Sequence, residues 1–253
     1  MSFFFTKMQG LGNDFIVIDA VRHNISLSIE SIRKIADRHF GIGCDQVLIL
    51  KAPTENSSGV DFSYRIFNAD GGEAGFCGNG IRCLAKFALL SGLTKKRDLV
   101  FSTKTCTIKT HLEADGLVGV LLSSPIFEPK DIPFVAKEKA LRYNLQILGY
   151  DDIEIGVVGV GNPHAVVMCN DCLNDNLITD LGPLISNNER FPERVNVDFM
   201  RVLSRDCVEL RVYERGSGET LACGSGACAC VVVGNLWGVL DSVVRVKLLG
   251  GDL

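Results

Sequence analysis

The sequence predicts an α+β protein of two pseudo-symmetric domains that arose by internal duplication. Each domain is expected to be a mixed or antiparallel sheet wrapped around a buried central helix. One short motif, Cys-Gly-x-Gly, occurs twice, at 77–80 and 223–226, and an apolar stretch follows each copy. A Gly-x-Gly-Asn turn also occurs twice, at 10–13 and 159–162. The cysteines are 146 residues apart (77 to 223) and the asparagines 149 (13 to 162), which indicates a duplicated domain rather than a solenoid.

The segments before the two motifs repeat as well. Residues 64–73 and 210–219 each show strand-like alternation, a polar turn and a glycine-containing step to a glutamate. Residues 123–134 contain three prolines and read as the connection between the halves. We therefore expect one domain at 1–122 and the other at 123–253, each long enough to bury a core.

The elements of the first half follow from local pattern. A helix is predicted at 28–40, because Ile29, Ile32, Ile35 and Ala36 recur at helical spacing with Gly41 past the end. A second helix is predicted from Gly80, with Gly92 as its C-terminal cap. Short segments rich in β-formers predict strands, with a hairpin around Asp115-Gly116. These strands are 3–5, 15–19, 47–50, 62–67, 99–101, 105–112 and 117–122.

The second half repeats this scheme. Strands are predicted near 153–158, 165–169, 196–202 and 208–213. The helix from Gly226 to about Asn235 is apolar all round, so we expect it to have no solvent face and to be buried.

Composition excludes several classes of function. The formal net charge of −4 leaves no basic footprint for nucleic acid, and no apolar run approaches the roughly 20 residues of a membrane span. No segment reads as a signal peptide, so ten cysteines predict reduced thiols and a cytoplasmic protein. Most of them are expected to be packing residues. These are Cys44, Cys83, Cys106, Cys169, Cys172, Cys207, Cys228 and Cys230.

The repeated motif places each thiol, Cys77 and Cys223, at the entry of a helix. The first N–H groups of a helix have no internal partner and carry partial positive charge, so they bind a carboxylate and lower the pKa of a nearby thiol. At least one thiol is therefore expected to have thiolate character. Two such termini meeting in an interdomain cleft would clamp one α-carboxylate and place a sulfur on each face of the α-carbon. No pyridoxal-phosphate lysine signature or phosphate loop is present, so we expect neither cofactor nor metal.

Polar residues at the turns and strand ends complete the pattern. A single asparagine is common in turns, but Asn13, Asn68, Asn162 and Asn196 have a paired arrangement that favours ligand binding. Glu214-Arg215 occupies the position equivalent to Asn68-Ala69, and an adjacent acid and base suit a zwitterionic amino acid. His164 lies in one of the repeated loops, near a proposed thiol.

Together these segments resemble the diaminopimelate epimerase family over nearly the whole chain. The matching segments are 10–15, 41–46, 67–71, 77–83, 161–164, 196–197 and 214–227. The resemblance implies pyridoxal-phosphate-independent interconversion of LL- and meso-2,6-diaminopimelate, which serves lysine and peptidoglycan synthesis. It also implies two pseudo-symmetric domains with the active site in the interdomain cleft, and often a homodimer.

The resemblance also implies residue roles. Cys77 and Cys223 are the alternating acid and base, and His164 and Glu214 tune the two thiols. The implied substrate contacts are Asn13, Gln46, Asn68, Gly78, Asn79, Asn162, Asn196, Glu214, Arg215, Gly224 and Ser225.

Two alternatives remain from the sequence. A proline or hydroxyproline racemase also uses two thiols, although the asparagine set and Glu214-Arg215 exceed what a proline ring needs. A metal or redox protein would use Cys77-x5-Cys83 and Cys223-x4-Cys228-x-Cys230, but these spacings miss the usual zinc and Cys-x-x-Cys patterns.

Overall fold

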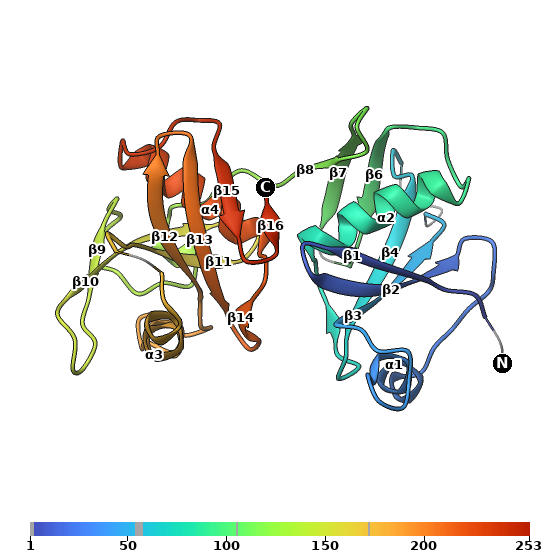
Figure 1. Cartoon of the computed structure of the whole chain (residues 1–253), viewed down its shortest axis with the longest axis horizontal. Helices are drawn as coiled ribbons and strands as arrows, with labels where there is room; N and C mark the ends of the chain where they lie inside the picture. The colour runs from blue at the N-terminus through green and yellow to red at the C-terminus, as the bar shows by residue number, and fades with distance from the viewer. Residues whose placement is uncertain (1–2, 54–57, 105, 172) are drawn as a thin grey trace. The chain divides into compact units, whose positions relative to one another are not determined.

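The computed structural model describes residues 3–53, 58–104, 106–171 and 173–253. The chain divides into two compact units, Met1–Leu121 and Leu122–Leu253, and each contains one eight-stranded sheet (Figure 1). The predicted duplicated α+β architecture is confirmed. The division after Leu121 lies one residue before the predicted boundary. Thr105, the predicted start of a strand, and Cys172, predicted to be a packing residue, lie outside the described residues.

The sheet of the first unit has the strand order β1-β2-β3-β4-β6-β7-β8, with β5 paired to β4. The β2–β3 and β4–β6 pairs are parallel and the others are antiparallel, so the sheet is mixed, as predicted. The strands are β1 (Thr6–Gly10), β2 (Asn13–Ala20), β3 (Gln46–Lys51), β4 (Phe62–Asn68), β5 (Glu73–Ala74), β6 (Asp98–Ser102), β7 (Thr107–Leu112) and β8 (Val118–Leu121).

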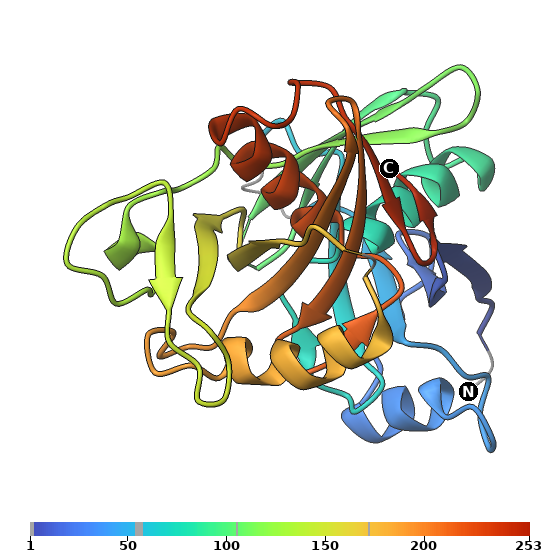
Figure 2. The same ribbon diagram turned by 60° about the vertical axis from the view of Figure 1, so that its left-hand side comes forward.

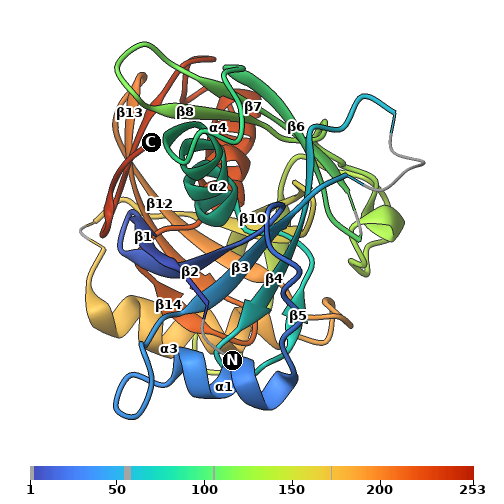
Figure 3. The same cartoon turned by 90° about the vertical axis from the view of Figure 1, so that its right-hand side faces the viewer.

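Helix α2 (Gly78–Leu90) is the central helix of this unit. It contacts both β1 and β8, strands from the two ends of the sheet order, because the sheet curls around it (Figure 3). Ile81, Leu84 and Ala88 are buried against the side chains of β2, β3 and β4. Helix α1 (Ile29–Ala36) covers the opposite sheet face with a smaller cluster that includes Ile32.

The sheet of the second unit has the order β16-β15-β13-β12-β11-β10-β9, with β14 paired to β13. Helix α4 (Gly224–Leu236) packs on one face, and α3 (Asp175–Ser186) packs on the other (Figure 2). The remaining elements are η1 (Pro129–Asp131), β9 (Tyr143–Leu145), β10 (Ile153–Gly159), β11 (Pro163–Met168), β12 (Asn196–Ser204), β13 (Cys207–Glu214), β14 (Gly218–Thr220), β15 (Arg245–Leu248) and β16 (Gly251–Asp252).

The duplication extends to the hydrogen-bond register. In the first unit β2 runs parallel to β3 with Phe15 opposite Gln46. In the second unit β11 runs parallel to β12 with His164 opposite Asn196. Equivalent residues of the two halves can therefore be paired one by one.

Two predicted elements of the first half are wrong in extent. The first helix spans Ile29 to Ala36 rather than 28–40, because Asp37 turns extended and its carboxylate accepts the backbone N–H groups of His39 and Phe40. Such side-chain to backbone bonds compete with a helix. Residues 3–5 are not a strand, and pairing begins only at Thr6.

Two predictions for the second half also need correction. Helix α4 is not buried all round: Cys228 and Leu236 are exposed, because α4 packs one side on the sheet and its other side points away. Helix α3 was not predicted, since Gly182 and Pro183 interrupt its pattern. Gly182 is needed there because a Cβ atom would lie 2.7 Å from the Tyr213 ring.

Gly156 of β10 sets how closely α4 approaches the sheet. A Cβ atom at Gly156 would lie 2.5 Å from Val233 Cγ1 of α4 and 3.0 Å from the Trp237 ring. We predict that Gly156→Ala lowers the free energy of unfolding by about 1–3 kcal/mol, measured by urea titration. Gly119→Ala in β8 is the control, since its nearest neighbour would be His111 O at 3.8 Å. Equal stability of the two variants would contradict this packing.

Candidate active site

Both repeated cysteines are the N-cap residues of the central helices. Cys77 precedes α2 and Cys223 precedes α4, each with extended backbone (φ −143°, ψ 118° and φ −125°, ψ 111°). Neither side chain caps its helix, so neither thiol is committed to the helix end. The helices begin at Gly78 and Gly224, two residues before the predicted starts, and the motif forms the first turn.

In the first unit Cys77 lies against the turn between β1 and β2. Its sulfur donates a hydrogen bond to Asn13 Oδ1 at 3.4 Å, and Asn13 Nδ2 donates to Asp45 Oδ2 at 2.9 Å. Because Asp45 holds the amide nitrogen, the carbonyl oxygen of Asn13 is turned toward the thiol. The predicted neighbours Cys77 and Asn13 are thus brought together.

A charged cluster that the sequence analysis did not identify anchors Asp45. Arg38 binds both Asp14 and Asp45 at 2.7 Å, and Lys7 lies 2.8 Å from Asp14. Burial opposes the charged form of Asp14, but hydrogen bonds from Arg38 and Lys7 outweigh it and lower the pKa of that carboxyl. Asp14 therefore remains an anion that holds the cluster together.

The other predicted site residues of this unit lie in the same region of the first unit. Gln46 Nε2 donates to Asn68 Oδ1 at 2.8 Å across paired positions of β3 and β4. Among the described residues, Gln46 Oε1 is buried without a hydrogen-bond partner. Asn79, next to Gly78 in the first turn of α2, is buried and accepts a hydrogen bond from Arg82 at 2.7 Å.

In the second unit the equivalent turn and strand carry the predicted site residues. Asn162 lies in the turn between β10 and β11, and Asn196 opens β12. Asn196 Oδ1 accepts the backbone N–H of Arg215 at 3.0 Å. Within the described part of the chain, Asn196 Nδ2 is a buried donor without a partner.

Glu214 lies beside the second thiol. Thr220 donates a hydrogen bond to its carboxylate at 2.6 Å, and the carboxylate is also in hydrogen-bond contact with Cys223. Burial raises the pKa of Glu214, although the Thr220 bond and the nearby His164 act in the opposite direction. A carboxyl group of this kind can take up a proton from the neighbouring sulfur.

The environment of Cys223 opposes the expected effect of the helix N-terminus on its pKa, while thiolate character of at least one of the two thiols stays a prediction. Burial, followed by the charges of Glu214 and Asp198, raises the pKa of the Cys223 thiol well above its usual range. Hydrogen bonds from Ser225 and from the Gly226 backbone act in the expected direction but are outweighed. The helix N-terminus therefore does not lower the pKa of this thiol below its usual range, because desolvation of a buried sulfur is the larger effect.

His164 is buried among three hydrogen-bond partners. Its Nδ1 lies 2.7 Å from Asp198 Oδ2, and its Nε2 lies 2.9 Å from Asn162 Oδ1 and 3.0 Å from Ser225 Oγ. The Ser225 hydroxyl in turn lies 3.4 Å from the Cys223 sulfur. The sequence analysis missed Asp198, although a single acidic residue inside the apolar strand 196–200 was a signal for it.

The remaining described cysteines divide into three groups by burial. Cys44, Cys83 and Cys230 are buried as predicted, and burial raises the pKa of Cys44 and Cys83 to about 11. Cys106 and Cys228 are exposed, so the prediction that they pack is wrong. Cys169 and Cys207 are partly buried.

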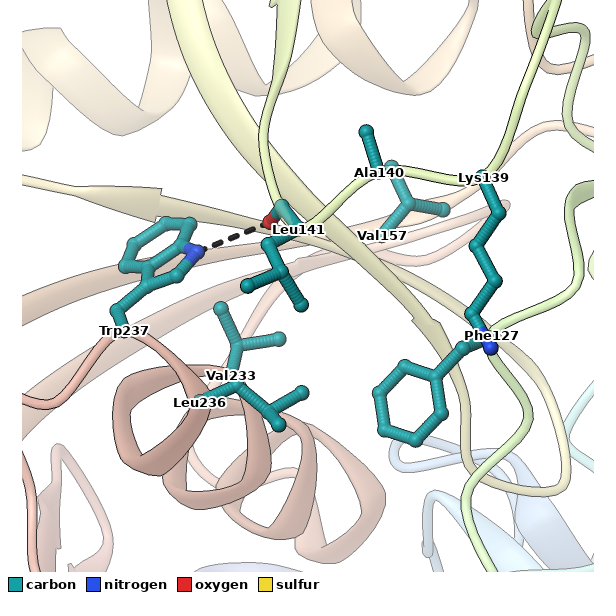
Figure 4. A pocket seen from close by; sticks show the side chains of 8 residues that line it. All are labelled: Phe127, Lys139, Ala140, Leu141, Val157, Val233, Leu236 and Trp237. Atoms are coloured by element: carbon teal, nitrogen blue, oxygen red, sulfur yellow. Dashed lines mark hydrogen bonds between the residues drawn. The ribbon is translucent and has the colours of Figure 1, made fainter.

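A separate pocket of the second unit lies at the other end of α4 (Figure 4). Val233, Leu236 and Trp237 line it, and Trp237 Nε1 donates to Leu141 O at 2.9 Å. Cys223 lies ten or more residues away along the helix, about 15 Å at 1.5 Å per residue. Among the described residues that line this pocket, Lys139 is the only charged one. The pocket therefore lacks the group of polar side chains that surrounds each of the two thiols.

Across 3–53, 58–104, 106–171 and 173–253, no group of three His, Cys, Asp or Glu side chains could hold a metal ion. None of the helices in those ranges is long and apolar enough to cross a membrane.

Solved structures with this fold include a racemase and an epimerase. A probable proline racemase from Agrobacterium radiobacter K84 superposes with a TM-score of 0.67 at 15% identity, covering 98% of this chain and 82% of that one. A hydroxyproline epimerase from Agrobacterium vitis superposes with a TM-score of 0.65 at 13% identity, with the same coverage. At these identities the likeness is one of fold alone.

The family is defined by sequence. The model of the diaminopimelate epimerase family matches residues 5–127 and 156–253. The diaminopimelate epimerase of Nitrosospira multiformis is 50% identical over 98% of this chain and 88% of its own length. That of Laribacter hongkongensis is 52% identical over 98% and 89%. The chain belongs to the diaminopimelate epimerase family and is an isomerase, and neither alternative class from the sequence analysis has comparable support.

The buried carboxyl of Glu214 predicts a pH-dependent cost in stability. Because its pKa is raised in the folded state, its stabilising contribution is present below the unfolded-state pKa of about 4.3 and is lost as pH rises through the folded pKa. We predict that Glu214→Gln gains stability relative to the parent protein as pH rises above about 4.3, measured by urea unfolding from pH 4 to 8. Glu189→Gln at an exposed position is the control. A constant difference across this range would contradict the burial argument.

Proposed function

We propose that the protein interconverts LL- and meso-2,6-diaminopimelate by a two-base proton transfer at the α-carbon, without a cofactor. The observation that carries the proposal is the equivalence of Cys77 and Cys223. They are the N-cap residues of the central helices in two duplicated units. Inversion of a carbon centre requires a base on one face and an acid on the other. A duplicated half-site supplies one such group in each unit.

The two helix N-termini would bind the α-carboxylate. The first-turn N–H groups of α2 and α4, at 78–79 and 224–225, have no carbonyl partner within their own helix. Directed at one carboxylate, they would stabilise the carbanion that forms when the α-proton leaves, an effect worth several kcal/mol in a dry site. The α-proton is a very weak acid, so this stabilisation is needed beside the thiolate.

Proton balance assigns a task to Glu214. One thiolate removes the α-proton and becomes a thiol, while the other thiol gives its proton to the opposite face and becomes a thiolate. For Cys223 to act as the base, its S–H proton must first leave, and the contacting Glu214 carboxylate accepts it as O–H. Cys77, which donates to Asn13, has the opposite role in that half of the cycle.

The distal end of diaminopimelate carries a second ammonium and a second carboxylate. Gln46 Oε1 is a buried acceptor and Asn196 Nδ2 a buried donor, each without a partner among the described residues. An acceptor suits the ammonium group and a donor suits the carboxylate, with the Arg215 guanidinium as a further cation. We propose Asn13, Asn68, Asn79 and Asn162 as the other polar contacts.

The setting of this activity is also a proposal. We infer that the enzyme works in the cytoplasm, where the precursors of lysine and peptidoglycan are made, and that it needs no metal. The expected homodimer stays a prediction.

We predict that Cys77→Ala and Cys223→Ala each lower kcat for LL-diaminopimelate by about 10²–10⁴-fold, because one face loses its acid or base. Turnover is measured by chiral chromatography of the product. Cys228→Ala, on the exposed side of α4, is the matched control and is expected to keep full activity. Normal turnover by either active-site variant would refute the two-base mechanism.

We predict that lysine, which lacks the distal carboxylate, has a kcat/KM about 10⁴-fold below that of diaminopimelate. A site built to bind a polar group leaves its own buried donors unpaired when the group is missing. The measurement is α-deuteration of each amino acid in deuterated water, followed by NMR. Comparable values for the two amino acids would show that the distal end is not recognised.

A further inference from the structure

The second half-site contains a buried chain of four polar groups. It runs from Asp198 Oδ2 to His164 Nδ1 (2.7 Å), from His164 Nε2 to Ser225 Oγ (3.0 Å), and from Ser225 Oγ to Cys223 Sγ (3.4 Å). All four residues are buried, and His164 and Asp198 are fully so. Burial strengthens such hydrogen bonds and makes their direction matter.

The fold does not need this polar pair. By strand register, His164 and Asp198 occupy the positions that Phe15 and Leu48 hold in the first unit. Phe15 and Leu48 pack on the first turn of α2, each 3.3 Å from the position of a Cβ atom on Gly80. In the first unit an apolar pair therefore packs under the first turn of the central helix, at the position that the polar pair His164 and Asp198 holds in the second unit.

The pair also has a cost. Asp198 Oδ1 is buried without a hydrogen-bond partner among the described residues, and it lies where a Cβ atom on Gly226 would be only 2.4 Å away. A buried polar atom without a partner is destabilising, because it loses its hydrogen bonds with water and gains none in the protein. A costly pair that the fold does not require points to a role in the chemistry.

The partners of His164 define its hydrogens. Nδ1 faces the Asp198 carboxylate, and Nε2 faces the carbonyl oxygen of Asn162, and both are acceptors. To donate a hydrogen bond to both acceptors, the ring must carry a hydrogen on each nitrogen. Nε2–H is then directed at Ser225 Oγ as well, so the Ser225 hydroxyl hydrogen is left for the Cys223 sulfur.

We propose that Asp198 is a positioning residue for Cys223: it holds His164 doubly protonated, so that Ser225 donates its hydroxyl hydrogen to the sulfur. Asp198 alone would disfavour a thiolate, as any nearby anion does. In the pair, His164 is nearer to the sulfur along the chain and presents the positive end. Without Asp198, a neutral His164 would accept the Ser225 hydrogen at Nε2, and the thiolate would lose its donor.

The proposal rests on the proposed function of Cys223, but its primary test does not require turnover. Iodoacetamide alkylates the thiolate, so peptide mass spectrometry after timed alkylation from pH 7 to 10 reports the thiolate fraction of each cysteine. We expect Asp198→Asn to slow alkylation of Cys223 about tenfold at pH 8, the effect of losing one hydrogen bond to a charged group. Cys77 in the same sample is the internal reference and is expected to be unchanged. Asp241→Asn, at an exposed ion pair with Arg205, is the control variant.

The kinetic readout follows from the same argument. Besides Asp198, the titratable groups of the second unit that face the Cys223 region are His164, Glu214 and Cys230. We expect Asp198→Asn to move the rising limb of kcat/KM to higher pH, with kcat about tenfold lower and KM unchanged, since Asp198 does not touch substrate. If the enzyme proves inactive on diaminopimelate while the alkylation result holds, the relay stands and the proposed function fails.

A second variant separates this role from a structural one. Asp198→Leu introduces the residue type found at the equivalent position in the first unit, and we expect it to fold and to show the same slow alkylation. Faster alkylation of Cys223 in Asp198→Asn would mean that Asp198 acts only as a nearby anion, and would overturn the proposal. Unchanged alkylation, or a loss of stability in Asp198→Leu without a specific effect on Cys223, would overturn it as well.

Discussion

The close packing of each central helix's N-terminus against its sheet is the constraint on which both half-sites depend. Gly80 and Gly226 lie in the first turns of α2 and α4. A Cβ atom would lie in tight contact with Leu48 at 3.3 Å in one unit and would collide with Asp198 at 2.4 Å in the other. With glycine there, the N-cap cysteine of each helix is brought to the strand ends that carry the asparagines. The close approach of each helix's first turn to its sheet therefore fixes where each thiol lies.

On this shared frame the two halves have diverged in chemistry. The first supports its thiol from the β1–β2 turn, through Asn13 and an anchored Asp45. The second supports its thiol from within the core, through His164, and places a carboxyl group at Glu214 in contact with it. A reaction that needs one acid and one base at a time suits such unequal halves, because different surroundings give the two thiols different tendencies to ionise.

Much of this could be predicted from the sequence. The duplication, the order of the main strands and both helix-capping cysteines follow from local spacing. The ionisation of Cys223 could not, because it depends on burial and on Asp198, which approaches only after β11 and β12 pair. Helix α3 escaped prediction because its Gly182 serves packing on Tyr213, a contact between segments 31 residues apart (182 to 213). Tertiary packing overrode local pattern in both cases.

The most direct measurement of the central claim is the early isotope pattern in deuterated water. LL-diaminopimelate is incubated with the enzyme, and the reaction is stopped before a tenth of the substrate has reacted. Both isomers are then separated, and the deuterium content of each is measured by mass spectrometry. Two thiols on opposite faces predict that each meso molecule carries one solvent deuterium, while the remaining LL substrate carries almost none. Meso product that retains the substrate's own α-hydrogen would mean that a single base serves both faces, and would contradict the account.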